Sequence, residues 1–96
     1  MKTVTREEFL QIIKKDKEIL VDFYADWCGK CKDLEVTLEK YEDNFDVIKV
    51  NIEKCPELAR KYEIEKLPQL LLFRKGKLIA RQGASSYAFL KKISSE

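Results

Sequence analysis

The chain has 96 residues, of which 45% are hydrophobic and 38% are charged, and its net charge is +2. This length predicts one domain, residues 1–96, whose single core buries somewhat over about 60% of the surface of the unfolded chain. The small, evenly spread charge argues against nucleic acids and membrane surfaces as partners, and no apolar run reaches the roughly 18 to 20 residues that span a bilayer.

The first predicted elements are a short strand over residues 2–4 and a helix that extends to about Lys15. Thr5 and Glu8 have the spacing of a capping box at the start of this helix. Residues 19–24 form an almost continuous apolar run, which is typical of a strand covered on both faces. The beginning of the chain therefore predicts a buried strand that follows an amphipathic helix.

A second helix is predicted from about residue 30 to residue 43, because apolar side chains recur at helical spacing. These apolar residues are Leu34, Leu38, Tyr41 and Phe45. Residues 47–52 predict the next strand, and Pro56 opens a short helix that extends through Tyr62.

Two strands, residues 69–74 and 77–81, are joined by a tight turn at Lys75 and Gly76. A last helix follows, with its apolar face formed by Tyr87, Leu90 and Ile93. Parallel crossovers early in the chain and an antiparallel hairpin late in it predict an α/β fold, a three-layer α/β/α sandwich.

Two cysteines, Cys28 and Cys31, stand where the strand 19–24 gives way to the second helix. Their spacing places both sulfurs on one side of the first helical turn, close enough for a disulfide. Unpaired N–H groups at the helix start and the charges of Lys30 and Lys32 favour a negative charge there. We therefore expect Cys28 to be the thiolate nucleophile and Cys31 to be the resolving thiol.

The segment 21–31 reads VDFYADWCGKC and closely resembles the active-site segment of thioredoxins, VDFWA-x-WCGPC. The resemblance continues through residues 49–52, 61–64, 67–76 and 83–84. It implies a thioredoxin fold with a shortened N-terminus and a central five-stranded mixed sheet. It also implies a protein-disulfide reductase that acts on client proteins with accessible disulfides and is recycled by a thioredoxin reductase, as part of cell redox homeostasis.

The chain departs from the family pattern at four positions: Lys30 replaces a proline, Tyr24 a tryptophan, Gln69 a threonine and Val36 a helix-kinking proline. A cation between the cysteines stabilises the Cys28 thiolate and with it the reduced form. We therefore expect a reduction potential at most some tens of millivolts above the value of about −270 mV for thioredoxin, still on the reducing side. The alternative is that Lys30 points into water and changes the potential little.

Asp22 is the only charged residue in the apolar run 19–24. Burial on both faces of a sheet raises the pKa of a carboxyl group towards neutrality, where Asp22 can take the proton of Cys31. A solvated aspartate on an edge strand is the alternative that the residues leave open. The resemblance favours the buried position and implies that Lys49 approaches it, so Asp22 and Lys49 join Cys28 and Cys31 as predicted catalytic residues.

The resemblance further implies a substrate-binding surface beside the cysteines. In thioredoxins the proline that matches Pro68 is cis and the backbone of the preceding residue pairs with a substrate peptide, whereas most X-Pro bonds are trans. The surface implied here consists of Trp27, Gly29, Lys30, Leu67, Pro68, Gly83 and Ala84.

The chain has three cysteines and no histidine. A structural zinc site needs four ligands, so we expect no metal and no cofactor, and a zinc or iron-sulfur site would require a dimer that shares two CxxC pairs. Cys55 lies at the start of a predicted helix, where we expect an exposed thiol with a mildly lowered pKa. It is either a bystander or the site of an intermolecular disulfide or glutathionylation.

The first residues carry neither the apolar stretch nor the cleavage site of a secretory signal, so we expect a cytoplasmic protein and a monomer. Two other functions stay open. The charged residue within CxxC is compatible with an oxidising or isomerising catalyst, and a related binding subunit would not need its CxxC at all.

Overall fold

The structure, a computed structural model, describes residues 1–83 and 87–94. Within these residues a five-stranded sheet has the order β1-β3-β2-β4-β5. The pairs of β3 with β1 and with β2 are parallel, while β4 is antiparallel to β2 and to β5. The predicted mixed sheet is therefore confirmed. The strands are β1 (Lys2–Thr3), β2 (Glu18–Tyr24), β3 (Asp46–Asn51), β4 (Gln69–Arg74) and β5 (Lys77–Gln82).

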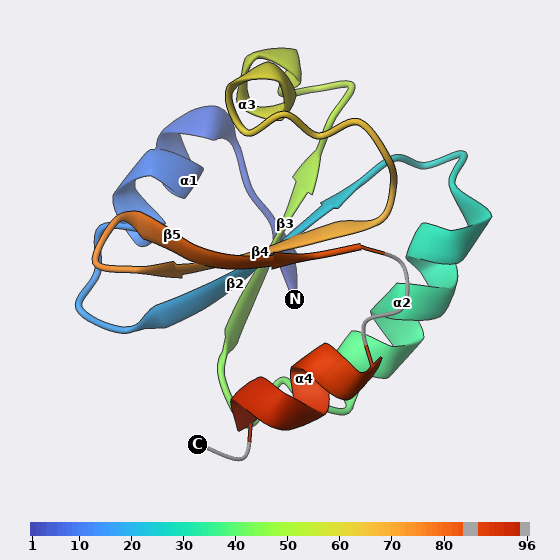
Figure 1. Cartoon of the computed structure of the whole chain (residues 1–96). Helices are drawn as coiled ribbons and strands as arrows, with labels where there is room; N and C mark the ends of the chain where they lie inside the picture. Colours follow the sequence, from blue (N-terminus) through green and yellow to red (C-terminus); the bar gives the residue numbers. More distant parts are fainter. Residues whose placement is uncertain (84–86, 95–96) are drawn as a thin grey trace.

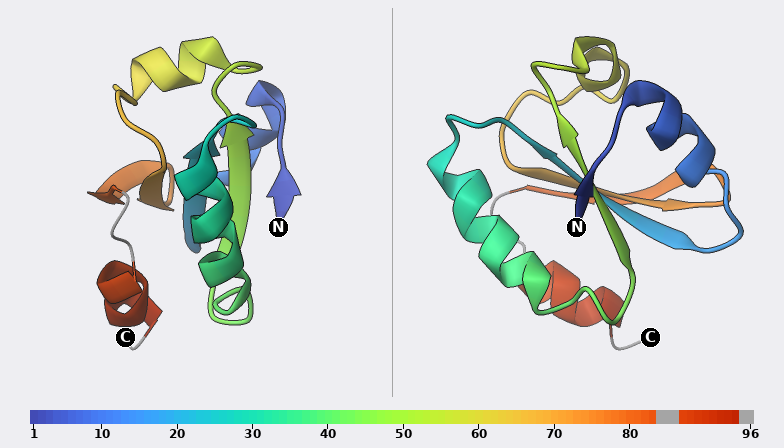
Figure 2. Two further views of the ribbon diagram at one scale, coloured as in Figure 1. Left: turned by 90° about the vertical axis from the view of Figure 1, so that its right-hand side faces the viewer. Right: turned by 180° about the vertical axis from the view of Figure 1, so that it is seen from behind.

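Four helices lie on the two faces of this sheet in the described part of the chain, which confirms the three-layer architecture. Figures 1 and 2 show α1 and α3 on one face and α2 and α4 on the other. The helices are α1 (Arg6–Ile12), α2 (Gly29–Glu39), α3 (Pro56–Lys61) and α4 (Tyr87–Ser94).

Strand β2 lies in the middle of the sheet and its side chains alternate between two hydrophobic cores. Phe23 packs in the core under α1 and α3, beside Phe9, and Leu20 packs in the core under α2 and α4, beside Leu38. Asp22 is two residues from Leu20 and therefore faces α2. The apolar strand thus places one carboxyl group beneath the helix that follows it.

The predicted capping box at the start of α1 is confirmed. The Thr5 hydroxyl oxygen accepts the Glu8 N–H at 3.2 Å, and the Glu8 carboxylate accepts the Thr5 N–H at 3.0 Å. The helix ends at Ile12, earlier than the predicted Lys15, because the Ile13 carbonyl accepts the Gly76 N–H at 2.6 Å instead of continuing the helix. The β4–β5 turn therefore closes the end of α1.

Replacing Thr5 with alanine is expected to lower the free energy of unfolding by about 1 kcal/mol, because the Glu8 N–H loses its acceptor. Chemical denaturation followed by circular dichroism measures this loss. The matched control is Thr37→Ala in the last turn of α2, where the hydroxyl only reaches the Asp33 carbonyl at 3.5 Å. The control should change the free energy by less than about 0.5 kcal/mol, and equal losses in the two variants would argue against the cap.

Helix α2 is shorter than predicted and ends at Glu39 rather than near residue 43. The chain then turns through tighter hydrogen bonds, from the Tyr41 N–H to the Leu38 carbonyl and from the Asn44 N–H to the Tyr41 carbonyl. Tyr41 and Phe45 stack on each other and pack against the core under α2 and α4 from these turns. The helical spacing of Tyr41 and Phe45 in the sequence therefore comes from their contacts with the core and does not mean that the helix continues.

Candidate active site

The two cysteines of the CxxC motif form a disulfide at the start of α2. Cys28 caps the helix, and its Sγ accepts the backbone N–H of Cys31 at 3.1 Å. The two Cα atoms are 5.3 Å apart, and the residues are 7% and 3% exposed. A backbone N–H and the positive end of the helix dipole therefore point at the sulfur of Cys28, where they favour a negative charge once the disulfide is opened.

The outer side of this turn is open to solvent. Trp27 is 68% exposed, Lys30 is exposed, and a Cβ atom added at Gly29 would have no neighbour within 4 Å. The predicted positions at the motif itself are thus accessible to a large partner.

The segment before β4 lies against the cysteines. The Leu67–Pro68 peptide bond is cis, as the resemblance implies, and Leu67 packs against the cluster that contains Cys28 and Cys31. Gly83 follows Gln82, the last residue of β5, and Gln82 is paired with Leu70, the second residue of β4. Gly83 therefore lies at the same end of the strands as Pro68. Ala84 lies outside the described residues.

Asp22 is completely buried, because β2 lies between β3 and β4, so the alternative of a solvated edge-strand aspartate is wrong. Its carboxyl group lines a cleft of about 350 Å³ that Cys31 also lines. Neither carboxylate oxygen has a hydrogen-bond partner among the described residues. Burial raises the pKa of Asp22 to about 7, against a lowering influence of Lys49 and with a further raising influence of Glu35.

Lys49 lies beside Asp22 on β3, as their parallel register dictates, but its ammonium group is paired with another carboxylate. Lys49 Nζ donates to Glu35 Oε1 at 2.9 Å and lies 4.4 Å from the centroid of the Tyr24 ring. Sequence reasoning missed Glu35. The available signal was its position four residues after Cys31, which places both residues on one side of a helix.

The prediction of an exposed Cys55 thiol with a lowered pKa is wrong. Cys55 is 5% exposed and belongs to the core under α1 and α3, beside Leu58. Burial raises the pKa of this thiol, and the nearby carboxylates of Glu57 and Glu7 raise it further. The helix start at Pro56 therefore does not activate Cys55.

No group of at least three metal-ligating side chains that could hold an ion occurs in residues 1–83 and 87–94. In the same residues, no helix has both the length and the apolar character needed to cross a membrane.

Comparisons with known proteins agree with this geometry. The family model described as Thioredoxin matches residues 1–95. Thioredoxin-1 of Saccharomyces cerevisiae is 37% identical over 90 residues, which cover 91% of this chain and 87% of that protein. The thioredoxin of Buchnera aphidicola is 44% identical over 85 residues, which cover 83% of this chain and 78% of that protein. A solved structure of Plasmodium falciparum thioredoxin superposes with a TM-score of 0.90 at 27% identity, over 99% of this chain and 97% of that one.

Proposed function

The chain belongs to the thioredoxin family, and we propose that within this family it reduces disulfides of client proteins with Cys28 as nucleophile and Cys31 as resolving thiol. It has the thioredoxin fold and is a thiol-disulfide oxidoreductase, and the expected general role includes recycling by a thioredoxin reductase and cell redox homeostasis. The observation that carries the residue assignment is a disulfide at the start of α2 beside a buried carboxyl group.

The first step uses the reduced form of the CxxC pair. The Cys28 thiolate attacks one sulfur of the client disulfide, the client S–S bond breaks, and a mixed disulfide forms. The other client sulfur leaves as a thiolate and takes a proton from water. The hydrogen bond from the Cys31 N–H to Cys28 Sγ, 3.1 Å long, supports Cys28 as the sulfur that carries the negative charge.

The second step releases the client. The Cys31 thiol gives its proton to the Asp22 carboxylate while its sulfur attacks Cys28 Sγ, the mixed disulfide breaks, and the second client thiolate leaves. Two electrons have then moved from the dithiol to the client, and the Cys28–Cys31 disulfide has formed. Asp22 suits this role because it shares the cleft with Cys31 and because its pKa of about 7 populates both protonation states near neutral pH. The Lys49 ammonium favours the ionised carboxylate.

The client binds, in this proposal, on the open side of the CxxC turn. An extended client segment pairs with the backbone of Leu67, beside Pro68, while exposed apolar surface at Trp27 covers the client disulfide. The full proposed surface consists of Trp27, Gly29, Lys30, Leu67, Pro68, Gly83 and Ala84.

The setting of the reaction is part of the same proposal. Residues 1–96 act as one thioredoxin domain and as a monomer that carries electrons from a thioredoxin reductase to client disulfides. A cytoplasmic location suits this role, because that compartment keeps thiols reduced. Cell fractionation and size-exclusion chromatography test the location and the monomer.

The reduction potential of the Cys28–Cys31 pair tests the reductase function against the oxidant or isomerase function. Equilibration in dithiothreitol or glutathione buffers, followed by Trp27 fluorescence, should give a value within some tens of millivolts above about −270 mV. The control Lys30→Pro should lower the value, because it removes a cation that stabilises the thiolate. A potential near about −180 mV would instead favour an oxidant or isomerase.

A further inference from the structure

Glu35 lines the cleft and pairs with Lys49, and the proposed reaction gives it no role of its own. We propose that Glu35 is a positioning residue that pairs with the Lys49 ammonium and so limits its attraction for Asp22, which keeps the Asp22 carboxylate a strong enough base to accept the proton of Cys31. The inference rests on the proposed role of Asp22 as proton acceptor. In this inference Glu35 does not touch the reacting atoms. It changes how readily Asp22 accepts the proton of Cys31, and it does so through Lys49.

The first restraint on Lys49 is the ion pair with Glu35. Lys49 Nζ lies 2.9 Å from Glu35 Oε1, and the two side chains are 12% and 39% exposed. Because the ammonium side of the pair is largely shielded from water, the pair is screened less than an exposed surface pair. Glu35 can hold it there because it faces β3 from α2, one helical turn after Cys31.

The second restraint is the aromatic ring of Tyr24. Lys49 Nζ lies 4.4 Å from the centroid of this ring, within the range of a cation–π contact. The Tyr24 hydroxyl is in turn hydrogen-bonded to Thr3 Oγ1 at 3.1 Å, which fixes the ring. The ammonium is thus held by a carboxylate and a ring face, while both oxygens of Asp22 have no hydrogen-bond partner in the described chain.

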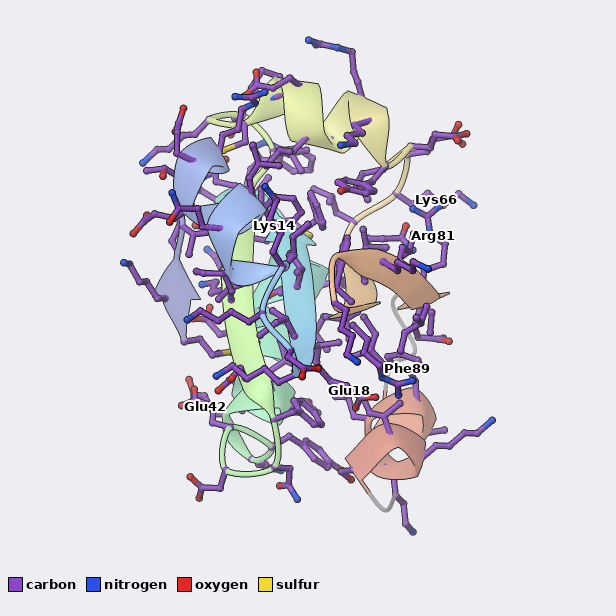
Figure 3. The ribbon with its side chains drawn as sticks, turned by 90° about the vertical axis from the view of Figure 1, so that its left-hand side faces the viewer. Lys14, Glu18, Glu42, Lys66, Arg81 and Phe89 are labelled. Atoms are coloured by element: carbon purple, nitrogen blue, oxygen red, sulfur yellow. A yellow bond between two sulfur atoms is a disulfide. The ribbon has the colours of Figure 1, made fainter. Side chains whose placement is uncertain are left out.

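The other groups that face Asp22 do not replace Glu35 in this role. Strand β4 presents leucines to this face of the sheet, and Leu70 pairs directly with Asp22. In α4, Lys91 is exposed, and Lys92 lines a groove with Glu18, the first residue of β2. Figure 3 shows Glu18 and Phe89, which also lines this groove. The titratable or charged residues that share the cleft with Asp22 are Tyr24, Asp26, Cys31, Lys32, Glu35 and Lys49.

Removing the charge of Glu35 leaves the Lys49 ammonium without its carboxylate. The register partner of Lys49 in β2 is Asp22, which is a buried carboxyl group without a hydrogen-bond partner in the described chain. Attraction by an unpaired cation stabilises the ionised carboxylate, so Asp22 loses its proton at a lower pH and becomes a weaker base. The proton of Cys31 is then accepted less readily near neutral pH.

The test is a direct titration of Asp22 in the oxidised protein, in which the two active-site cysteines do not ionise. Carbon-13 NMR of the labelled carboxyl group gives the midpoint. Glu35→Gln should lower this midpoint by about 0.5 to 1 pH unit. The matched control is Asp33→Asn, which removes the same charge from an exposed position of the same helix outside the cleft. The control should move the midpoint by less than about 0.2 pH units, because exposed charges are screened.

A second pair of proteins tests whether Glu35 acts through Lys49. In a Lys49→Met background, adding Glu35→Gln should move the Asp22 midpoint by less than half as much as in the parent. An unchanged midpoint in Glu35→Gln would overturn the inference, and so would an equal shift with and without Lys49, since that result means direct repulsion. The rate of insulin reduction by Asp22→Asn tests the proposed role of Asp22 independently of the titrations. A rate equal to that of the parent would overturn that role.

Discussion

Cys28→Ser is expected to lower the rate of insulin reduction by on the order of 10³-fold or more, because it removes the sulfur that attacks the client in the proposed first step. Cys31 is 3% exposed and lies three residues further along the chain, in the first turn of α2. Cys55 is enclosed in the core under α1 and α3. A serine hydroxyl at position 28 cannot replace the thiolate, since it does not ionise near neutral pH. The variant therefore keeps the fold but loses the first step.

The matched control is Cys55→Ala, which likewise removes one cysteine sulfur, but at a different position. It should leave the rate of insulin reduction near that of the parent, because Cys55 has no part in the proposed reaction. The rates are measured with each protein recycled by dithiothreitol and with the folded state checked by circular dichroism. Persistence of the parent's biological function in a Cys28→Ser, Cys31→Ser double variant would favour a binding subunit in which the CxxC motif is dispensable.

In the parent, the free energy of unfolding is expected to fall as the pH rises through the neutral range. In Asp22→Asn this fall is expected to be largely absent. The usual pKa of an aspartate is 3.8, and burial raises that of Asp22 to about 7. Below the lower value the carboxyl is protonated in both the folded and the unfolded chain. Between the two values the unfolded chain releases the proton while the folded chain keeps it, so the free energy of unfolding falls as the pH rises.

The size of this loss follows from the interval between the two pKa values. At about 1.4 kcal/mol for each pH unit, the interval corresponds to at most about 4 kcal/mol, which is large against the 5–15 kcal/mol of a typical domain. The loss is complete above the folded pKa, where Asp22 is ionised in both states. An asparagine at position 22 carries no charge, so its contribution does not depend on pH.

Urea denaturation of the oxidised protein at about pH 5 and about pH 8 should show a decrease of about 3 kcal/mol in the parent, and little decrease in Asp22→Asn. The range starts at about pH 5 in order to avoid the protonation of Glu8. The hydrogen bond with Lys2 lowers the pKa of Glu8, so this residue makes the free energy of unfolding fall as the pH falls, which is opposite to the effect of Asp22. The control is Asp46→Asn, which removes a carboxylate from a half-exposed position. It should keep the decrease in the free energy of unfolding that the parent shows between the two pH values. A decrease in Asp22→Asn as large as in the parent would argue against a raised pKa at Asp22.

The local features of the chain could be predicted because their physical causes lie within a few residues. The capping box of Thr5 and Glu8 depends on one helical turn, and the placement of Cys28 at the start of α2 depends on the change from an apolar run to helical spacing. The order of strands and helices follows in the same way from hydrophobic periodicity.

Three findings could not be predicted because they depend on contacts between layers. The pairing of Glu35 with Lys49 requires α2 to lie over β3, and the burial of Cys55 requires α3 to pack on the sheet. The end of α2 at Glu39 was missed because Tyr41 reaches the core from a turn with the same apolar spacing as a helix.

The α/β architecture and the redox-active cysteine pair could be predicted from the sequence, because the CxxC motif, the apolar strand before it and the helical pattern after it are all local. The choice between a buried and a solvated Asp22, and the partner of Lys49, followed from the tertiary structure. The pKa of Asp22 depends on how completely β3, β4 and α2 exclude water from it and on which carboxylate holds Lys49. Desolvation and charge pairing across layers are set by distances between segments far apart in the chain, and no local pattern encodes those distances.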